Sequence, residues 1–143
     1  MDKRIIIAGG TGLIGKRIIP LLLEKGYGIS IFTRNIDSAK NKFKHISLKY
    51  VNWDYTQPSE NIIEHLEGSY AIINFAGASI AGKRWSDKYK KVLYDSRVIT
   101  TRKIADSISK CVSKPICLIN TSAIGYYGTS GIEVLNEESP GGD

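Results

Sequence analysis

The sequence predicts an α/β protein built on a doubly wound parallel sheet, and three observations lead to this fold class. Short β-branched, apolar runs alternate along the chain with segments whose apolar residues recur at helical spacing. A strand followed by a helix and a second strand forms a right-handed crossover, which makes the strands parallel and covers both faces with helices. Hydrophobic residues make up 42% of the 143 residues and charged residues 24%, as in a globular domain. The expected strand order is 3-2-1-4-5.

The expected strands cover residues 4–8, 28–33, 47–52, 71–75 and 115–120, and the expected helices cover residues 12–25, 37–43, 61–66 and 86–110. The first helix ends at Gly26, and Pro20 is expected to bend it because proline removes a backbone hydrogen bond. The inner face of the last helix is expected to carry Tyr89, Val92, Leu93, Ser96, Ile99, Ile104 and Ile108. Residues 121–143 are expected to form a loop.

Length and composition predict one domain over residues 1–143 in the cytoplasm. No apolar run is long enough to cross a bilayer, and the start of the chain lacks the apolar region and cleavage site of a signal peptide. The two cysteines, Cys111 and Cys117, and the two histidines lack the spacing of zinc ligands, so no metal site is expected. We expect both cysteines to be buried as small apolar residues.

The net charge of +6 and the pI of about 9.3 favour anionic partners, which include both nucleotide cofactors and nucleic acids. A surface that binds nucleic acid combines one basic stripe with aromatic side chains. Here the basic runs at residues 40–44 and 88–91 fall on separate expected helices, so we interpret them as solvated helix faces. The sequence therefore favours a small anionic ligand over nucleic acid.

The strongest motif follows the first expected strand and consists of Gly9, Gly10, Thr11, Gly12, Leu13, Ile14 and Gly15. Glycines at this spacing permit a tight turn, let the backbone approach a pyrophosphate and let a helix and a strand pack closely. The helix that begins here presents free N–H groups and the positive end of its dipole to phosphates. Because the motif follows a buried strand and opens a helix, it predicts a Rossmann-type dinucleotide-binding domain. The alternative is a glycine-rich turn without a ligand.

The end of the second expected strand indicates which dinucleotide is bound. A site for NAD usually has Asp or Glu here to hold the ribose hydroxyls, whereas this chain has Thr33, Arg34 and Asn35. Arg34 can pair with a 2′-phosphate and stack on adenine, and Thr33 can add a hydroxyl contact. The sequence therefore predicts NADP in preference to NAD. In the alternative interpretation, Arg34 is a solvated loop charge.

Two further loops follow strands and fit the same cofactor. Trp53 and Asp54 follow the third strand, where they either contact the adenine or anchor the surface. The fourth strand ends at the point where the strand order reverses, with Asn74, Phe75, Ala76 and Gly77. Small residues there let the backbone lie against the dinucleotide, or they simply pack the end of the strand.

The chain resembles the short-chain dehydrogenase/reductase superfamily at residues 9–15, 74–77 and 120–123. Four further segments, residues 80–85, 95–98, 122–128 and 137–140, are similar to the nucleoside-diphosphate-sugar epimerases of its atypical branch. The resemblance covers the whole chain and implies NADP binding and a small-molecule substrate of the nucleotide-sugar class. Some members of that branch are also labelled cell-division inhibitors.

The resemblance also implies roles for individual residues. Ser122 matches the superfamily serine that hydrogen-bonds a substrate carbonyl or hydroxyl, and is the expected catalytic residue. Arg97 matches a cofactor-side position, although it could equally be one more basic residue on the helix surface. Tyr126 and Tyr127 either shape a substrate pocket or pack against each other. Trp85, with its two basic neighbours, belongs either to an anion-binding lid or to a solvated loop.

One feature of active superfamily members is missing from these 143 residues. Those enzymes carry a tyrosine four residues before a lysine, and the lysine lowers the tyrosine pKa for acid–base chemistry. None of the eight tyrosines here has a lysine at that spacing. We therefore expect the cofactor-binding half of a longer enzyme, with an incomplete sheet, no substrate lobe and little activity of its own. The competing interpretation is a non-catalytic NADP-binding sensor or partner-binding module.

The fifth expected strand lies at one end of the predicted strand order. An apolar strand at the edge of a sheet has unpaired backbone groups that can pair with another chain. The sequence therefore predicts a homo-oligomer formed through residues 115–120.

Overall fold

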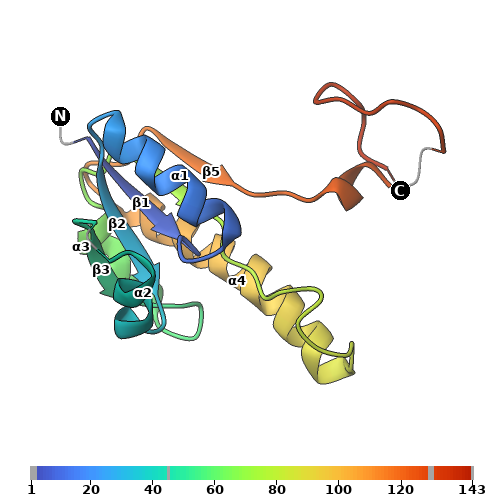
Figure 1. The fold of residues 1–143 in the computed structure, drawn as a ribbon, viewed down its shortest axis with the longest axis horizontal. Helices are drawn as coiled ribbons and strands as arrows, with labels where there is room; N and C mark the ends of the chain where they lie inside the picture. Colours follow the sequence, from blue (N-terminus) through green and yellow to red (C-terminus); the bar gives the residue numbers. More distant parts are fainter. Residues whose placement is uncertain (1–2, 45, 129–130, 143) are drawn as a thin grey trace.

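The computed structural model describes residues 3–44, 46–128 and 131–142 and contains the predicted parallel sheet (Figure 1). Its strands are β1 (Arg4–Ala8), β2 (Gly28–Thr33), β3 (Lys49–Asn52), β4 (Ala71–Asn74) and β5 (Cys117–Asn120). They pair in the order β3-β2-β1-β4-β5, with every neighbouring pair parallel. The predicted strand order is thus confirmed, and the order reverses between β1 and β4.

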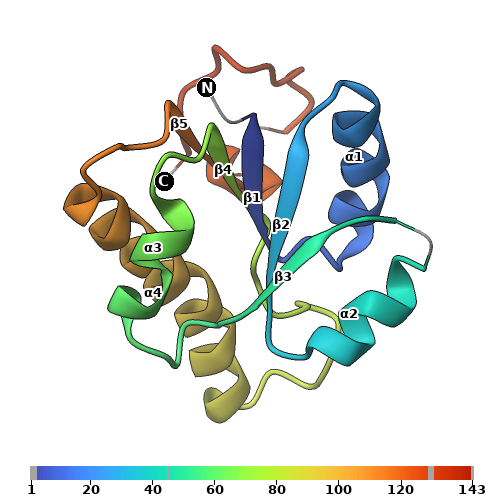
Figure 2. The same ribbon diagram turned by 90° about the vertical axis from the view of Figure 1, so that its left-hand side faces the viewer.

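Helices cover both faces of this sheet (Figure 2). One face carries α1 (Leu13–Glu24) and α2 (Ile36–Lys42), and the other carries the 3-10 turn η1 (Ser59–Ile62), α3 (Ile63–Leu66) and α4 (Asp87–Lys110). The predicted helix at residues 61–66 is therefore a 3-10 turn continued by one α-helical turn. Helix α1 continues through Pro20 without interruption. No helix in the described ranges is long and apolar enough to span a membrane.

The run of isoleucines in β1 shows why this sheet has two covered faces. Ile6 packs with Phe32, Trp53 and Ile104 on the α4 side, whereas Ile7 packs with Ile19 and its neighbours on the α1 side. Both side chains are completely buried although they point in opposite directions. A parallel strand covered on both faces has a continuous apolar sequence, which is the pattern that predicted β1 as a buried strand.

The inner face of α4 is more polar than predicted. Its buried residues are Ser96, Thr100, Ile104 and Ser107, whereas Tyr89, Val92 and Leu93 are half-buried. Thr100 Oγ1 and Ser107 Oγ each donate to the carbonyl oxygen one turn earlier in the helix, at 2.8 and 2.7 Å. These bonds satisfy the buried hydroxyl groups inside the helix, so small polar residues can face the sheet. The N-terminal half of α4 extends past the sheet (Figure 1), which explains why its apolar residues remain partly exposed.

Strand β5 lies at the edge of the sheet, as predicted, and most of its surface is open. Ile119 is 53% exposed, and Cys117 is also exposed. The prediction that both cysteines are buried is therefore correct for Cys111 and wrong for Cys117, because no described element packs on that face of β5. Beyond β5 the chain leaves the sheet and forms a projecting segment that contains the 3-10 turn η2 (Ile124–Tyr127) (Figure 1).

The two thiols are expected to differ sharply in their reaction with a maleimide. Cys111 is 4% exposed, its Sγ donates to the Ser107 carbonyl oxygen at 3.3 Å, and burial raises the pKa of its thiol. Because the thiolate is the reactive form, Cys111 should react only when the domain unfolds. Mass spectrometry of the native chain should show one rapid addition, at Cys117, and two after denaturation. Rapid addition to a Cys117→Ser variant would contradict the burial of Cys111.

Candidate functional site

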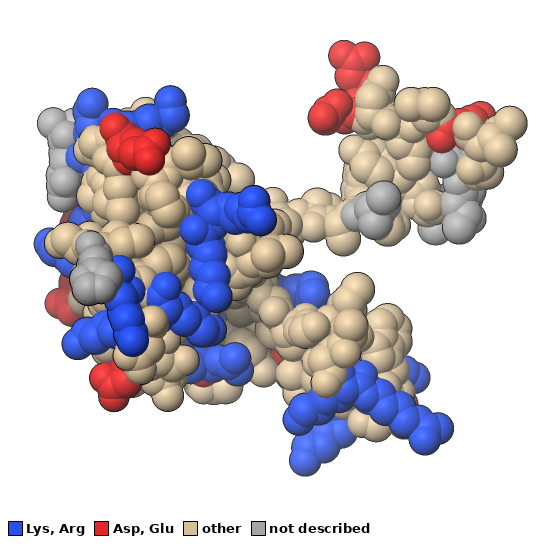
Figure 3. Space-filling model, in the orientation of Figure 1, with Lys and Arg blue, Asp and Glu red and all other residues tan. Residues whose placement is uncertain are grey.

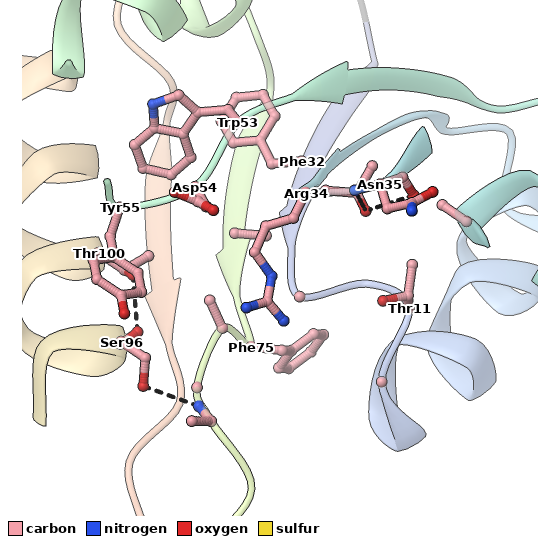
Figure 4. Close-up of a pocket in the computed structure, with 18 of the residues that line it drawn as sticks. Thr11, Phe32, Arg34, Asn35, Trp53, Asp54, Tyr55, Phe75, Ser96 and Thr100 are labelled. Carbon is pink, nitrogen blue, oxygen red and sulfur yellow. Dashed lines mark hydrogen bonds between the residues drawn. The ribbon is translucent and has the colours of Figure 1, made fainter. Parts of the chain in front are cut away.

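A cavity of about 350 Å³ opens at the carboxyl ends of the strands, next to the point where the strand order reverses (Figure 4). Loops after β1, β2, β3 and β4 contribute to its walls, together with one face of α2 and one face of α4. Open α/β sheets bind their ligands at this position. The lining residues that the sequence predicted are Gly9, Thr11, Gly12, Thr33, Arg34, Asn35, Trp53, Asp54, Phe75, Ala76 and Gly77.

The glycines of the first loop divide into two groups. Gly9 and Gly12 line the cavity, and Gly9 has a positive φ of 72° with its missing Cβ directed at the Phe75 backbone. Gly10 and Gly15 lie outside the cavity lining. A Cβ on Gly10 would be 3.2 Å from Ile7, and one on Gly15 would be 2.2 Å from the Gly10 carbonyl oxygen. Gly10 and Gly15 therefore serve the close packing of α1 on the sheet, which is a part of the motif's predicted role.

The first turn of α1 has the properties of an anion site. Its N-cap is Gly12, which has no side chain to accept a hydrogen bond, and its first turn contains no acidic residue. In contrast, the Asn35 side chain caps α2, the Ser86 side chain caps α4, and both helices have an aspartate in the first turn. The N–H groups at the start of α1 thus lack side-chain acceptors, as expected where a phosphate binds. Leu13 and Ile14 contribute only backbone here, since their side chains are exposed and outside the lining.

A basic wall faces this helix start from the loop after β2 and from α2. Arg34 extends its guanidinium into the cavity towards Phe75 (Figure 4), and Lys42 also lines it. Among the described residues neither side chain makes a hydrogen bond or an ion pair. Thr33 Oγ1 and Asn35 Oδ1 are already used, because they accept from the backbone N–H groups of Asn35 and Ser38 at 3.3 and 2.8 Å. Arg34 and Lys42 are therefore the cations that remain available to a ligand.

The wall on the other side comes from the loop after β3 and from α4. Trp53 is only 3% exposed, donates from Nε1 to the Pro58 carbonyl oxygen and packs on Phe32, so it is mainly a core residue. Asp54 Oδ1 accepts from Thr56 N and Thr56 Oγ1, which fixes its carboxylate at the rim. A carboxylate at this place can accept a hydrogen bond from an exocyclic amino group of a base.

Two predicted site residues hold the cavity wall without lining it. Asn74 is 3% exposed, and its Nδ2 donates to Asn120 Oδ1 at 2.7 Å while its Oδ1 accepts from Ala76 N at 3.1 Å. Arg97 donates to the carbonyl oxygens of Leu93 and Ala78, at 3.0 and 3.1 Å. Neither side chain faces the cavity, so both act on the loop after β4 and not on a ligand directly.

Ser122 is not among the lining residues of this cavity and lies on the segment beyond β5. It lines a separate open hollow with Ala123, Tyr126 and Tyr127, and the two tyrosine rings meet edge to face at 5.3 Å. Trp85 is 57% exposed and donates from Nε1 to the Ile80 carbonyl oxygen, so its side chain links the two ends of the loop at residues 80–85. Eleven of the predicted cofactor residues thus line one cavity, whereas the predicted catalytic serine lines a separate hollow.

Sequence reasoning missed several lining residues, most of them on helices. They are Ala8, Phe32, Ser38, Ala39, Lys42, Tyr55, Ala78, Val92, Ser96 and Thr100. A signal for some of them exists, because Ser38 and Lys42 are four residues apart on α2, directly after Arg34. Val92, Ser96 and Thr100 likewise recur every four residues along α4, which places them on one helix face.

Lysines and arginines are confined to the part of the chain before β5 and are absent from the segment after it. No lysine or arginine follows Lys114 in the sequence. In Figure 3 the basic side chains are spread over the sheet body and the projecting end of α4, whereas the projecting segment shows acidic ones. This distribution attracts anions to the part of the molecule that contains the cavity.

The fold and the site together define a Rossmann-type NAD(P)-binding domain. The NAD dependent epimerase/dehydratase family matches residues 5–141, and the chain belongs to this family. It is 33% identical over 140 residues to the chloroplastic epimerase family protein SDR39U1 homolog of Arabidopsis thaliana. The alignment covers 96% of this chain and 39% of the relative. Identity to the epimerase family protein YfhF of Bacillus subtilis is 34%, over 97% of this chain and 44% of the relative. The chain therefore spans less than half the length of these relatives.

Solved structures show the same fold. Human epimerase family protein SDR39U1 (isoform2) with NADPH is 26% identical, with a TM-score of 0.77 over 98% of this chain and 43% of that chain. The UDP-Glc/GlcNAc 4-epimerase from Campylobacter jejuni has a TM-score of 0.79 at 19% identity, over 97% of this chain and 43% of that chain. The second similarity is one of fold alone.

Proposed function

We propose that this chain binds NADP(H), in preference to NAD(H), in the cavity at the carboxyl ends of β1 to β4. The observation that carries the proposal is the basic wall of Arg34 and Lys42, which stands where a site for NAD has a carboxylate. The hydroxyl of Ser38 lines the same wall. Two cations and a hydroxyl suit a 2′-phosphate. The human relative that carries NADPH supports this choice of dinucleotide.

The rest of the cavity suits the remaining parts of the dinucleotide. The pyrophosphate would lie against Gly9 and Gly12, at the uncapped start of α1, where backbone N–H groups can donate to it. The adenine would lie between the loop after β3 and α4, with its amino group donating to the Asp54 carboxylate. The cofactor, when bound, supplies a hydride acceptor or donor, and the residues described here bind and orient it.

The preference for NADPH should be about tenfold or more and should depend on Arg34. A hydrogen bond to a charged group contributes about 1.5–3 kcal/mol, which corresponds to roughly 10- to 150-fold in affinity. Titrate NADPH and NADH by calorimetry against the unaltered chain, Arg34→Ala and the control Arg102→Ala, an exposed arginine on α4 outside the lining. Arg34→Ala should weaken NADPH binding and leave NADH binding unchanged. Equal affinities for both dinucleotides in the unaltered chain would refute the preference.

We also propose that the domain serves an epimerase or oxidoreductase with a nucleotide-sugar substrate, and that Ser122 orients a substrate carbonyl or hydroxyl. Membership of the epimerase/dehydratase family supports this class of reaction. The second candidate is a non-catalytic NADP-binding module. It is favoured because Ser122 is not in the cavity lining and because these 143 residues contain no tyrosine–lysine pair. The open edge of β5 supports pairing with another strand, in a homo-oligomer or with further polypeptide.

A further inference from the structure

We propose that Ser96 and Arg97 are positioning residues that hold Ala78 from both sides and thereby set the cavity wall after β4. The inference rests on the proposed dinucleotide site and assigns a role on this loop to two residues of α4, Ser96 inside the cavity lining and Arg97 outside it. Four consecutive residues of this loop, Phe75 to Ala78, line the cavity. A wall made of backbone and small side chains can follow a ligand closely only if its path is fixed.

The near end of the loop is fixed by the sheet. Phe75 N donates to the Ala8 carbonyl oxygen at 2.9 Å, and Ala76 N donates to Asn74 Oδ1 at 3.1 Å. Beyond Ala76 the chain has left the strand and needs other contacts. At the far end of the loop, Ala78 is hydrogen-bonded by two side chains of α4.

Ser96 binds the N–H side of Ala78. Its Oγ accepts from Ala78 N at 2.9 Å and donates to the Leu93 carbonyl oxygen at 3.2 Å. Ser96 is 6% exposed, so removal of its hydroxyl would leave the Ala78 N–H without this partner in a half-buried place. Leaving a buried donor without a partner costs more free energy than a typical hydrogen bond contributes to stability.

Arg97 binds the C=O side of the same residue. Its Nη2 donates to the Ala78 carbonyl oxygen at 3.1 Å, and its Nη1 donates to the Leu93 carbonyl oxygen at 3.0 Å. The guanidinium lies against Gly77, where a Cβ would be 3.1 Å from Cζ. Both side chains thus meet at the Leu93 carbonyl oxygen, and Gly77 leaves the room that Arg97 occupies. We name this arrangement of Ser96, Arg97 and Ala78 the loop clamp.

The loop clamp makes a different prediction from a direct contact between Arg97 and a phosphate. The loop clamp contains neither Arg34 nor Lys42, the two cations assigned to the 2′-phosphate, so loosening it should weaken NADPH and NADH by the same factor. If Arg97 instead contacted a phosphate directly, only the variants without Arg97 would lose that ionic contact. Dinucleotide binding to those variants would then depend less on salt concentration. Ser96 is uncharged, so an equal loss in Ser96→Ala points to the loop and not to charge.

The test is calorimetric titration of both dinucleotides against Ser96→Ala, Arg97→Ala and the double variant. The matched controls are Ser109→Ala and Arg102→Ala, which change exposed residues of α4 outside the lining. We expect each clamp variant to weaken both dinucleotides by about fivefold to a hundredfold. The double variant should lose less than the product of the two losses, because one half of the clamp works poorly without the other. Melting temperatures of the variants show whether the fold is kept.

Gly77→Ala provides a second route that leaves both clamp residues in place. The new methyl group would shift the guanidinium by a few tenths of an ångström, so it should weaken both dinucleotides in the same way as Arg97→Ala but by a smaller factor. Clamp variants that match the controls would overturn the inference while the proposed function stands. A loss confined to Arg97→Ala, with a changed salt dependence, would also overturn it. An unaltered chain that binds neither dinucleotide would overturn the proposed function and this inference with it.

Discussion

Gly15→Ala is expected to destabilise the domain by about 3 kcal/mol, the upper part of the range for overpacked interiors. A Cβ at this position would lie 2.2 Å from the Gly10 carbonyl oxygen and 2.5 Å from both Gly10 C and Gly10 Cα. These are backbone atoms of the turn between β1 and α1, so they cannot rotate away as a flexible side chain can. Relief requires α1 to move away from the sheet, which opens the packing of Ile19. The melting temperature, followed by circular dichroism, should fall by roughly 10 °C.

Gly28→Ala is the matched control for this substitution. Gly28 begins β2, does not have a positive φ, and nothing lies within 4 Å of the position of its Cβ. The control should therefore melt within a few degrees of the unaltered chain. Similar melting temperatures for the two variants would mean that α1 does not approach the β1 turn as closely as the structure has it.

The same close packing explains which parts of the fold the sequence predicted well. Strands β1 and β2 have the predicted bounds because both faces of each strand are covered, so every buried residue of the two strands is apolar or small. Strand β5 has a similar apolar sequence, and yet it is two residues shorter than predicted and its Cys117 is exposed. An apolar pattern shows that a residue suits burial. It does not show which element covers it.

The candidate site shows a similar division. Sequence motifs predicted the loops after the strands, because parallel strands bring their carboxyl ends together whatever the helices do. They did not predict Lys42 or Thr100, since the contact of a helix face with a cavity depends on how the crossover is placed. The family resemblance implied either a cofactor-side position or a surface position for Arg97. Its two backbone contacts were not predicted, because a backbone carbonyl acceptor cannot be recognised in the sequence.

The chain of 143 residues is expected to bind NADPH and to show no measurable turnover. Ser122 can polarise a carbonyl, but neither Tyr126 nor Tyr127, the phenols that share its hollow, has a lysine four residues later. General acid–base catalysis typically contributes about 10²–10⁴-fold. Fixed placement of the substrate can contribute several orders of magnitude more, and the hollow at Ser122 is open and exposed. Without both contributions, hydride transfer should stay close to its uncatalysed rate.

NADPH oxidation followed by absorbance, with small carbonyl compounds and sugar nucleotides as substrates, measures this directly. The NADPH titration on the same preparation shows that the cofactor site is intact, so absence of turnover cannot be assigned to an unfolded chain. Tyr94→Phe is the control variant, since Tyr94 is an exposed tyrosine of α4 far from the Ser122 hollow in the sequence. Turnover that persists in Tyr94→Phe but disappears in Tyr126→Phe or Tyr127→Phe would contradict the prediction. The hollow with Ser122 would then be an active site within these residues, working with a tyrosine that lacks the superfamily lysine.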